Sequence, residues 1–246
     1  MDLSNPTSTP RPPEAAHAPE RDLRQRDLIP PARLAACHAL VVGVGAIGRQ
    51  VALQLAAVGV PLLLLYDPDV VEGVNLAPQG YRPDQLGAAK ADATAGDCRQ
   101  LNPQVHVIAH AERFRRSTAR QVRVAGSSLL VFACVDRIGT RRLLWEALRD
   151  QAALLVDGRM SAEVLRVLAV ATPARDSYYA TTLFDAAEAY TGACTARSTI
   201  YTAAIAAGLM LGQMTRWLRR LAVDADLTLN LLAAELTTTT PPDGPR

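Results

Sequence analysis

The sequence predicts an α/β protein with an open, mostly parallel sheet and helices on both faces. Three observations carry this prediction: continuous apolar runs typical of buried strands, amphipathic segments between them, and a glycine-rich turn after the first strand. Strands that alternate with helices form right-handed crossovers, which produce a parallel sheet. At 246 residues, 49% of them apolar, the chain suits one large domain.

The predicted elements follow one another regularly along the chain. The run "HALVVGVG" (38–45) is apolar throughout, as expected for a strand buried on both faces. The next segment places Ile47, Val51, Leu55 and Val58 on one stripe, which indicates a helix. Further strands are predicted at 60–67, 105–111, 128–136, 153–158 and 163–173, and further helices at 86–101, 114–125, 139–151 and 198–220.

Both ends of the chain differ in composition from the middle. Residues 1–20 are rich in proline and charge, and "TTTTPPDGPR" (237–246) is polar, so we expect a flexible N-terminal arm and a flexible C-terminal tail around a domain at 21–236. The N-terminus lacks a signal-peptide core, and the apolar stretch 203–212 is too short to span a bilayer. We therefore expect a soluble, cytoplasmic protein without a membrane partner.

Charge and cysteine content limit the remaining classes. The net charge of +2 does not indicate a nucleic-acid partner, and we interpret the basic segment 113–123 as a solvated helix, with a nucleic-acid patch as the alternative. The four cysteines form no CxxC pair, so we expect neither zinc nor a disulfide framework. Cys134 lies in an apolar strand and is expected in the core.

The turn "GVGAIG" places Gly43, Gly45 and Gly48 between a strand and a helix. The first glycine permits the tight turn, the second lets the backbone approach a phosphate, and the third lets the helix pack closely. Asp67 ends the next strand, where a carboxylate can accept hydrogen bonds from ribose hydroxyls. This order predicts a Rossmann-like nucleotide site but does not distinguish NAD from ATP.

Five segments that follow one another in register carry a family resemblance. The series "RDLRQRDLIP" (21–30), "GVGAIG", "DPDVVEGVNLAPQGY" (67–81), "LGAAKADA" (86–93) and "CVDRIGTRR" (134–142) resembles the ThiF/MoeB/HesA adenylyltransferases, which belong to the ubiquitin-activating enzyme superfamily. The resemblance covers about residues 21–220. It implies that ATP and Mg²⁺ bind here and that the C-terminal carboxylate of a ubiquitin-like or sulfur-carrier protein is adenylated.

The resemblance also implies roles for single residues. The three loop glycines would line the nucleotide phosphates and Asp67 would hold the ribose. Lys90, the single lysine among 26 basic residues, falls on a phosphate-contacting lysine. Asp136 matches the acid that engages magnesium, and Arg141 matches the arginine that follows it. Asn75 and Gln79 match the polar positions of the family's N-L-x-R-Q stretch.

The chemistry requires such residues. A carboxylate that attacks the α-phosphate brings one anion to another, so cations must neutralise the developing charge. Magnesium does part of this and needs a carboxylate such as Asp136. A compact ammonium on a flexible stem, such as that of Lys90, can follow the phosphates more easily than a planar guanidinium.

One position departs from the family pattern. The N-L-x-R-Q stretch reads "NLAPQ" here, so Pro78 stands where an ATP-contacting arginine is expected. Arg49, in the first turn of the phosphate-facing helix, and Arg82 are the two candidates to replace the charge. If neither does, the chain would bind ATP but adenylate slowly, or act on an unusual substrate.

Two further segments raise questions about the later chemistry. In "TGACTARSTIYTAAIAAG" (191–208), Cys194 resembles the catalytic cysteine of activating enzymes, which holds the modifier as a thioester; the alternative is an unreactive loop cysteine. Arg197 would favour the thiolate, and Ser198 and Thr199 are candidate helix caps. In "DGRMSAEVLRV" (157–167), Arg159 is a candidate substrate contact or part of a structural turn with Asp157.

The main hypothesis is therefore an ATP-dependent adenylyltransferase that activates a partner protein ending in glycine. The resemblance further implies a homodimer, in which Arg24 and Gln25 reach the partner subunit's nucleotide. One alternative is a non-catalytic ATP-binding partner subunit, which Pro78 favours. The other is an NAD-dependent oxidoreductase, which would leave Lys90 and Asp136 without roles and for which no acid–base pair is evident.

Overall fold

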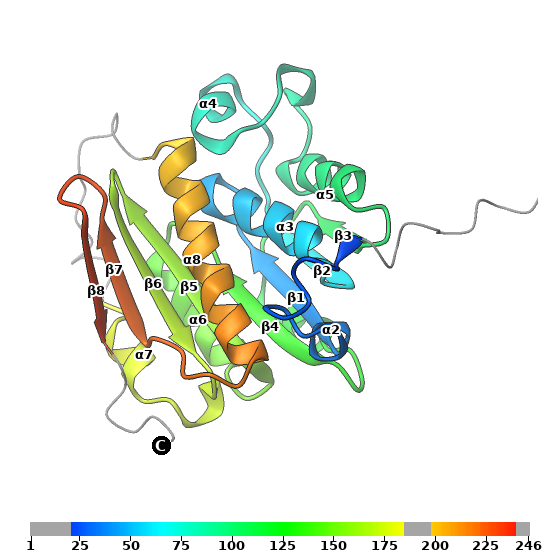
Figure 1. The fold of residues 1–246 in the computed structure, drawn as a ribbon. Coiled ribbons are helices and arrows are strands. Elements are labelled where there is room, and N and C mark those ends of the chain that lie inside the picture. The colour runs from blue at the N-terminus through cyan, green and yellow to red at the C-terminus, as the bar shows by residue number, and fades with distance from the viewer. Residues whose placement is uncertain (1–20, 185–197, 240–246) are drawn as a thin grey trace, which may run out of the picture.

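The computed structural model describes residues 21–184 and 198–239. Its strands form one eight-stranded sheet in the order β3-β2-β1-β4-β5-β6-β7-β8 (Figure 1). Pairing is parallel from β3 to β5 and antiparallel from β5 to β8, which confirms the predicted open, mostly parallel sheet. The strands are β1 (Cys37–Val42), β2 (Leu62–Tyr66), β3 (His106–His110), β4 (Ser128–Ala133), β5 (Ala152–Ser161), β6 (Val164–Val170), β7 (Asp226–Asn230) and β8 (Glu235–Thr239).

The strand order creates a switch point beside β1. Strand β1 pairs in parallel with β2 on one side, with Ala39 opposite Leu63, and with β4 on the other, with Cys37 opposite Ser128. The chain leaves β1 toward β2 and β3 and then returns to β4. Connections that diverge in this way open a crevice at the carboxyl ends of the two central strands, where ligands of open α/β sheets bind.

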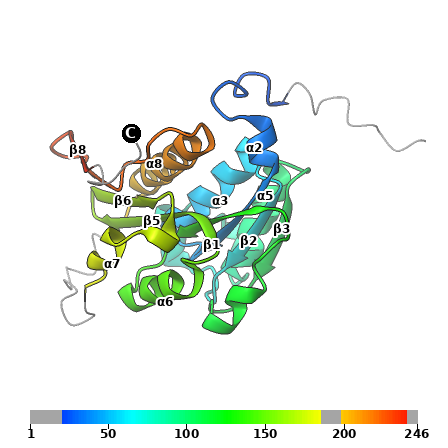
Figure 2. The ribbon, with the colours of Figure 1, turned by 90° about the horizontal axis from the view of Figure 1, so that it is seen from below.

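Helices cover both faces of the sheet (Figure 2). The long helices α3, α5 and α8 lie on one face, and α6 and α7 lie on the other (Figures 1 and 2). Packing against both faces explains why the central strands are apolar throughout rather than alternating. The helices are α2 (Pro31–Ala35), α3 (Ala46–Val58), α4 (Leu76–Gln79), α5 (Lys90–Leu101), α6 (Ile138–Leu148), α7 (Tyr178–Thr181) and α8 (Ile200–Leu218).

Two apolar cores hold the layers together, one on each face of the sheet. Val41 of β1 packs in the core that includes Leu55 of α3 and Met210 of α8. Leu40, its neighbour in the strand, packs in the opposite core with Trp145 of α6. Successive strand residues point to opposite faces, so one fully buried strand contributes to both cores and fixes its own register.

The structure corrects the helix predicted at 114–125. Only a short 3₁₀ helix forms there, Arg116–Arg120. The Thr118 hydroxyl accepts a hydrogen bond from the Arg115 N–H at 3.1 Å and donates to the Arg115 carbonyl at 2.6 Å. A hydroxyl that bonds nearby backbone in this way competes with α-helical bonding, so the local turn prevails over the arginine-rich helical pattern.

The C-terminal part of the sheet was not predicted. Strands β7 and β8 complete an antiparallel end, and β8 runs to Thr239, so the domain boundary expected at 236 lies within a strand. The threonine run resembles a polar tail in composition, but threonine also favours strands. The arm at 1–20 and the remainder of the tail lie outside the described residues. Within the described part of the chain, no helix has the length and apolarity needed to cross a membrane.

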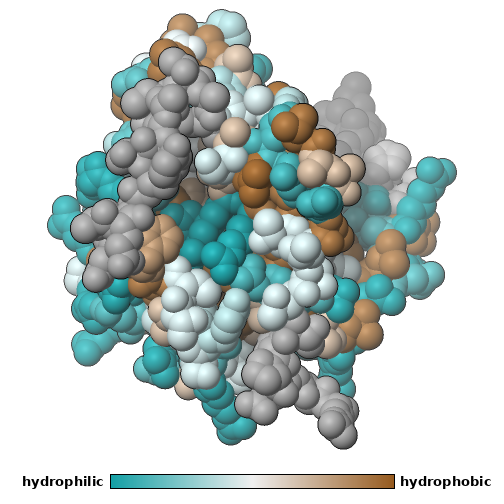
Figure 3. Space-filling view, turned by 90° about the vertical axis from the view of Figure 1, so that its left-hand side faces the viewer, coloured by the Kyte–Doolittle hydropathy of each residue, from teal (hydrophilic) through white to brown (hydrophobic). Residues whose placement is uncertain are grey.

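The β8 side of the molecule has a hollow in which hydrophilic side chains gather (Figure 3).

Polar contacts at the antiparallel end of the sheet link neighbouring elements. Arg166 of β6 forms two hydrogen bonds to Asp226 of β7, through Nε at 2.9 Å and Nη2 at 2.5 Å. The Tyr178 hydroxyl donates to the same carboxylate at 2.8 Å. Asp226 therefore ties α7 to the antiparallel strands.

Candidate functional site

The glycine loop begins directly after β1, and two of its glycines are required by space. Gly43 has a φ of +84°, and a Cβ at this position would lie 2.6 Å from the carbonyl oxygen of Cys134. A Cβ at Gly48 would lie 1.7 Å from the carbonyl oxygen of Gly43. The loop therefore packs against the end of β4, and α3 packs against the loop. No residue with a side chain fits at either position without moving backbone.

Gly45 has a different environment. It is the N-cap of α3, where no side chain caps the helix, and nothing lies within 4 Å of where its Cβ would stand. The first N–H groups of a helix have no partners within it, and the helix dipole favours an anion at that end. The open backbone surface at this helix start can accommodate a phosphate group, so the geometry of the loop is compatible with nucleotide binding.

Asp67, at the end of β2, holds the loop in place. Its side chain accepts hydrogen bonds from the Val44 N–H at 2.7 Å and from the Asp69 N–H at 2.9 Å. Burial raises the pKa of Asp67, and these two hydrogen bonds oppose that rise. Because each carboxylate oxygen has two acceptor positions, Asp67 can brace the loop and still accept a ribose hydroxyl.

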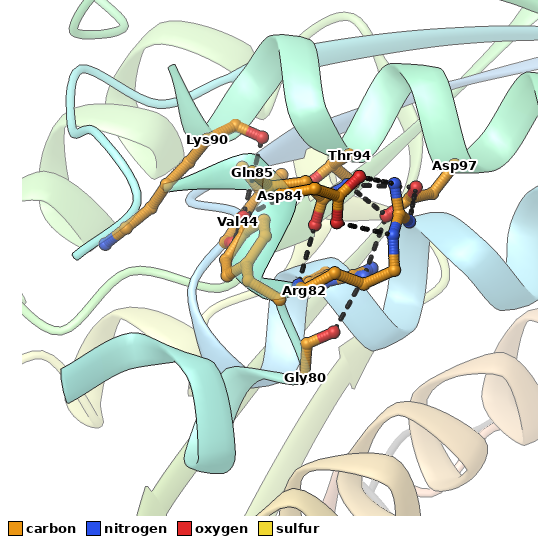
Figure 4. A network of polar contacts seen from close by, with 10 residues as sticks. Val44, Gly80, Arg82, Asp84, Gln85, Lys90, Thr94 and Asp97 are labelled. Carbon is orange, nitrogen blue, oxygen red and sulfur yellow. Dashed lines mark hydrogen bonds and ion pairs between the residues drawn. The ribbon is translucent and has the colours of Figure 1, made fainter. Parts of the chain in front are cut away.

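Lys90 is the first residue of α5 and is 7% exposed. Its ammonium lies 3.4 Å from the Asp69 carboxylate, and it also lowers the pKa of Asp67. The Lys90 side chain points away from the polar network on the other side of Val44 (Figure 4). The structure thus brings Lys90 near Asp67. Sequence reasoning missed Asp69, although the pair of acids in "DPD" was visible.

Asp136 follows β4 and is exposed. The residues just before it contact the glycine loop, since a Cβ at Gly43 would meet atoms of Cys134 and Val135. Among the described residues no group of three or more metal-ligating side chains forms a site. Magnesium does not require one, because it is usually bound by one or two carboxylates together with phosphates and waters. An exposed carboxylate at this edge fits that pattern.

Arg141 of α6 is bonded to its own fold. Its Nε donates to Asp157 at 2.8 Å, Nη2 donates to the Gly158 carbonyl at 3.1 Å, and Nη1 donates to the Asp136 carbonyl at 3.3 Å. In this arrangement Arg141 braces the Asp136 backbone against β5. Its guanidinium reaches the backbone of the magnesium candidate rather than open space.

Asp157 and Arg159 lie within strand β5, so the structural turn that the sequence offered as one interpretation is wrong, although the two residues do pair with each other. Asp157 is fully buried and accepts a second ion pair from Nε of Arg159 at 2.8 Å. Arg159 also donates to the carbonyl and hydroxyl oxygens of Thr182, both at 3.0 Å. A buried carboxylate needs such partners, because an unpaired buried charge is strongly destabilising.

The segment between β2 and α5 places the two polar residues of "NLAPQ" differently. Asn75 accepts a hydrogen bond from the Glu72 N–H at 3.0 Å and so caps a short 3₁₀ turn. The Gln79 side-chain oxygen is buried and has no hydrogen-bond partner among the described residues. Buried polar atoms are nearly always satisfied, so an orphan such as this one indicates a missing water or ligand.

A polar network lies between α3, α4 and α5, and sequence reasoning missed its centre (Figure 4). Asp97 accepts from Arg49 at 2.8 Å, from Arg82 at 2.5 Å and from Gln85 at 3.0 Å. Arg49 also donates to the Gly80 carbonyl at 2.8 Å. Asp97 is one of two acids in α5, and nothing in the sequence of the helix distinguishes it from Asp92. The partners of Asp97 lie on other elements, so the sequence of α5 does not identify them.

Tyr81 links this network to the glycine loop. Its hydroxyl donates to the Val44 carbonyl at 2.7 Å and contacts the Thr94 hydroxyl at 3.0 Å. The Arg49 guanidinium lies over the ring, 4.7 Å from its centroid. Burial raises the pKa of Tyr81 far above its usual value, so the phenol stays protonated and keeps donating.

Some predicted site residues lie elsewhere. Gln25 donates to the Val58 carbonyl at 3.0 Å, which places the Arg24–Gln25 pair at the opposite end of α3 from Gly45. Arg24 is exposed there. Cys194 and Arg197 lie outside the described residues.

Two smaller predictions can be compared directly with the structure. Thr199 caps α8 by accepting from the Thr202 N–H at 3.3 Å. Cys134 is partly buried and packs against the core of the α3 face. Burial raises its pKa well above the usual value, so its thiol is inert at neutral pH.

A hollow of about 710 Å³ opens at the amino ends of β1 and β4, away from the glycine loop. His38 lies in its lining, almost fully buried. Its ring nitrogens lie 2.9 Å from the Ser127 hydroxyl and 2.9 Å from the Val122 carbonyl, and burial lowers its pKa. This histidine is a satisfied structural residue, and the hollow is separate from the candidate site.

The doubly wound sheet and its glycine loop define a nucleotide-binding class of protein. Within that class, the model of the ThiF family matches residues 24–241, and the chain belongs to this family. Over 127 residues it is 40% identical to the SAMP-activating enzyme E1 of Haloferax volcanii, a stretch covering 51% of this chain and 46% of that protein. Over 148 residues it is 36% identical to the adenylyltransferase and sulfurtransferase MOCS3 of Sus scrofa, covering 56% and 32% respectively.

Solved structures share the fold at low sequence identity. PaaA superposes with a TM-score of 0.72 at 20% identity, covering 98% of this chain and 77% of PaaA. MccB of E. coli, crystallised with ATP, has a TM-score of 0.65 at 14% identity, covering 85% and 64%. These likenesses confirm the predicted fold. The chain spans less than half the length of the SAMP-activating enzyme and of MOCS3.

Proposed function

We propose that this chain binds Mg-ATP at the carboxyl ends of β1, β2 and β4 and adenylates the C-terminal carboxylate of a ubiquitin-like or sulfur-carrier protein. The observation that carries the proposal is the open backbone at Gly45, with Asp67 and Lys90 beside the same loop. The names of the relatives support the same class of reaction, and the crystal structure of MccB with ATP supports the choice of nucleotide.

The residues of the chain divide the work of this reaction. The α3 N-terminus binds phosphate oxygens, Asp67 orients the ribose, and Lys90 neutralises phosphate charge. Asp136 would hold Mg²⁺, which supplies further charge neutralisation. An oxygen of the substrate carboxylate attacks the α-phosphorus, the bond from that phosphorus to the bridging oxygen breaks, and pyrophosphate leaves with the electron pair.

A thioester on Cys194 is the proposed second step. The thiolate would attack the acyl carbonyl of the adenylate and release AMP. A homodimer in which Arg24 and Gln25 act on the partner's nucleotide is also part of the proposal. Gln25 lies at the end of α3 that is remote from the glycine loop, so Arg24 and Gln25 do not contact the loop of their own chain. This position is the support for a role at the partner's nucleotide.

The decisive experiment titrates the purified protein with Mg-ATP and separately with NAD, next to the Asp136→Ala variant. We expect magnesium-dependent ATP binding that weakens in the variant, and pyrophosphate release once a partner ending in glycine is added. Tight NAD binding that is indifferent to Asp136 would overturn the proposal in favour of an oxidoreductase. ATP binding without pyrophosphate release from any such partner would favour a non-catalytic subunit, which Pro78 makes a specific alternative.

A further inference from the structure

The α4 segment lacks a positive charge at the position where this family is expected to carry one. Pro78 stands there, in the middle of α4. Adenylyl transfer gathers negative charge around the phosphates, and a missing cation would slow it. Arg49 and Arg82 are the nearby candidates in the sequence, and their surroundings in the structure differ in a way that separates them.

Arg82 is paired with two carboxylates. Its Nε and Nη2 donate to the Asp84 carboxylate at 3.1 and 3.2 Å, and its Nη1 donates to Asp97 at 2.5 Å. The side chain is 45% exposed, so solvent screens its charge. All three nitrogens of this guanidinium donate to carboxylates, so two acids match its charge and only the second N–H groups of Nη1 and Nη2 remain.

Arg49 is the reverse case. It lies in the first turns of α3 and is 4% exposed. One nitrogen, Nη2, makes both of its hydrogen bonds, to Gly80 and Asp97. Its Nε and Nη1 are buried and have no partner among the described residues. Buried donors without partners are rare and indicate an absent ligand or water.

The charge of Arg49 is only partly cancelled. Asp97 is its one acidic partner in the described ion pairs, and the same carboxylate is shared with Arg82. Gln85 donates to both oxygens of Asp97 at 3.0 Å and satisfies it further. Arg82 has Asp84 as a second carboxylate partner, whereas the buried Arg49 has only the carboxylate that it shares with Arg82.

The position of Arg49 agrees with this role. Its guanidinium donates to the carbonyl of Gly80, which follows Pro78 by two residues in the sequence. Its ring contact with Tyr81, whose hydroxyl holds the Val44 carbonyl, connects it to the glycine loop. The orphaned oxygen of Gln79 lies in the same α4 segment. The unsatisfied polar atoms therefore gather around the segment that carries Pro78.

We propose that Arg49, from the α3 side, supplies the positive charge for the nucleotide phosphates that Pro78 leaves out of α4. This inference rests on the proposed function and names the residue that completes its phosphate site. It implies that the site can still catalyse adenylation, with a cation supplied by α3 instead of α4.

The test is Mg-ATP titration by calorimetry on four proteins: the wild type, Arg49→Met, the double variant Arg49→Met/Pro78→Arg, and Arg116→Met. We expect Arg49→Met to weaken Mg-ATP binding about tenfold or more, as for loss of a charge-assisted hydrogen bond. The double variant should recover most of the affinity. Arg116→Met removes the same charge from an exposed ion pair with Glu146 and should stay within about twofold of the wild type.

The rescue distinguishes a charge at the phosphates from a purely structural role, because arginine at position 78 does not restore the contacts of Arg49 with Asp97 and Gly80. Unchanged affinity in Arg49→Met, or no recovery in the double variant, would overturn the inference. If Arg49→Met does not fold, Arg49→Lys keeps the charge and should bind within about threefold of the wild type, and a tenfold loss there counts against the inference. A wild type that does not bind Mg-ATP refutes the proposed function instead.

Discussion

The ammonium of Lys90 lies 3.4 Å from the carboxylate of Asp69, and the backbone N–H of the same lysine donates to the Asp69 carbonyl at 2.9 Å. The lysine side chain is 8% exposed and the aspartate 63%. Lys90 begins α5, where the helix dipole disfavours a cation. Asp69 offsets this cost in the protein without nucleotide, and phosphate would take over its role.

We therefore predict that Asp69→Asn increases the stabilisation gained from Mg-ATP. Without the counter-ion the free protein should lose about 2 °C in Tm, while bound nucleotide no longer has to displace an ion pair. Thermal unfolding with and without Mg-ATP measures both effects. Asp92→Asn, in the same first turn of α5 and exposed, is the matched control. An equal nucleotide-induced rise in Asp69→Asn and in the wild type would contradict this exchange of partners.

Two alanine substitutions in the glycine loop should separate stability from binding. Gly48→Ala places a Cβ 1.7 Å from the Gly43 carbonyl, so the helix must shift and Tm should fall by several degrees. Gly45→Ala meets no atom within 4 Å, so Tm should hold while the methyl group obstructs the phosphate surface and ATP affinity falls. Unfolding curves and ATP titrations of the pair test this. Normal ATP binding by Gly45→Ala would place the phosphates elsewhere.

Stability in acid should depend on Asp226. Hydrogen bonding to Arg166 lowers the pKa of Asp226 below its usual 3.8, and a bond from Tyr178 adds to this. A lowered folded-state pKa contributes stability above the unfolded value, and that stability is lost as pH falls through the folded value. Asp226→Asn should therefore show a flatter decline in Tm from pH 5 to pH 2, from a lower starting point. Parallel curves for the two proteins would show that another acid controls this decline.

The thioester proposal gives a prediction about cysteines. With ATP and a partner ending in glycine, we expect a covalent adduct that thiols cleave and that Cys194→Ala abolishes. Cys98→Ala is the control, because burial raises the pKa of Cys98 to about 12 and keeps its thiol protonated at neutral pH. Mass spectrometry of the intact protein detects the adduct. An adduct that persists in Cys194→Ala would assign the chemistry to another residue.

The parts of the fold predicted from sequence are those with local or strongly periodic signals. The buried run of β1 and the stripe on α3 specify their own structure, and Gly43 and Gly48 mark the turn between them. Strand β8 carries only Leu236 as an apolar signal, and its partner β7 fixes its pairing. A strand with so few apolar residues is decided by its neighbours rather than by its own sequence.

The candidate site divides in the same way. Lys90 and Asp67 fall at strand and helix ends that a motif can locate. The partnership of Arg49 with Asp97 joins residues 48 positions apart in the sequence, and no short-range pattern encodes it. The sequence indicated Arg49 as a candidate cation but not that Arg82 binds the same carboxylate, that of Asp97. Such sharing is visible only when the elements are packed.

The shared carboxylate has a consequence for how this lineage can change. If arginine stood at position 78, Arg49 would no longer be needed for the phosphates, and a substitution of Arg49 would then leave Asp97 without its buried partner. Conversely, proline at 78 should persist only beside an arginine at 49. The residues at positions 49, 78 and 97 should therefore vary together among related sequences, and an alignment would show this as correlated substitution.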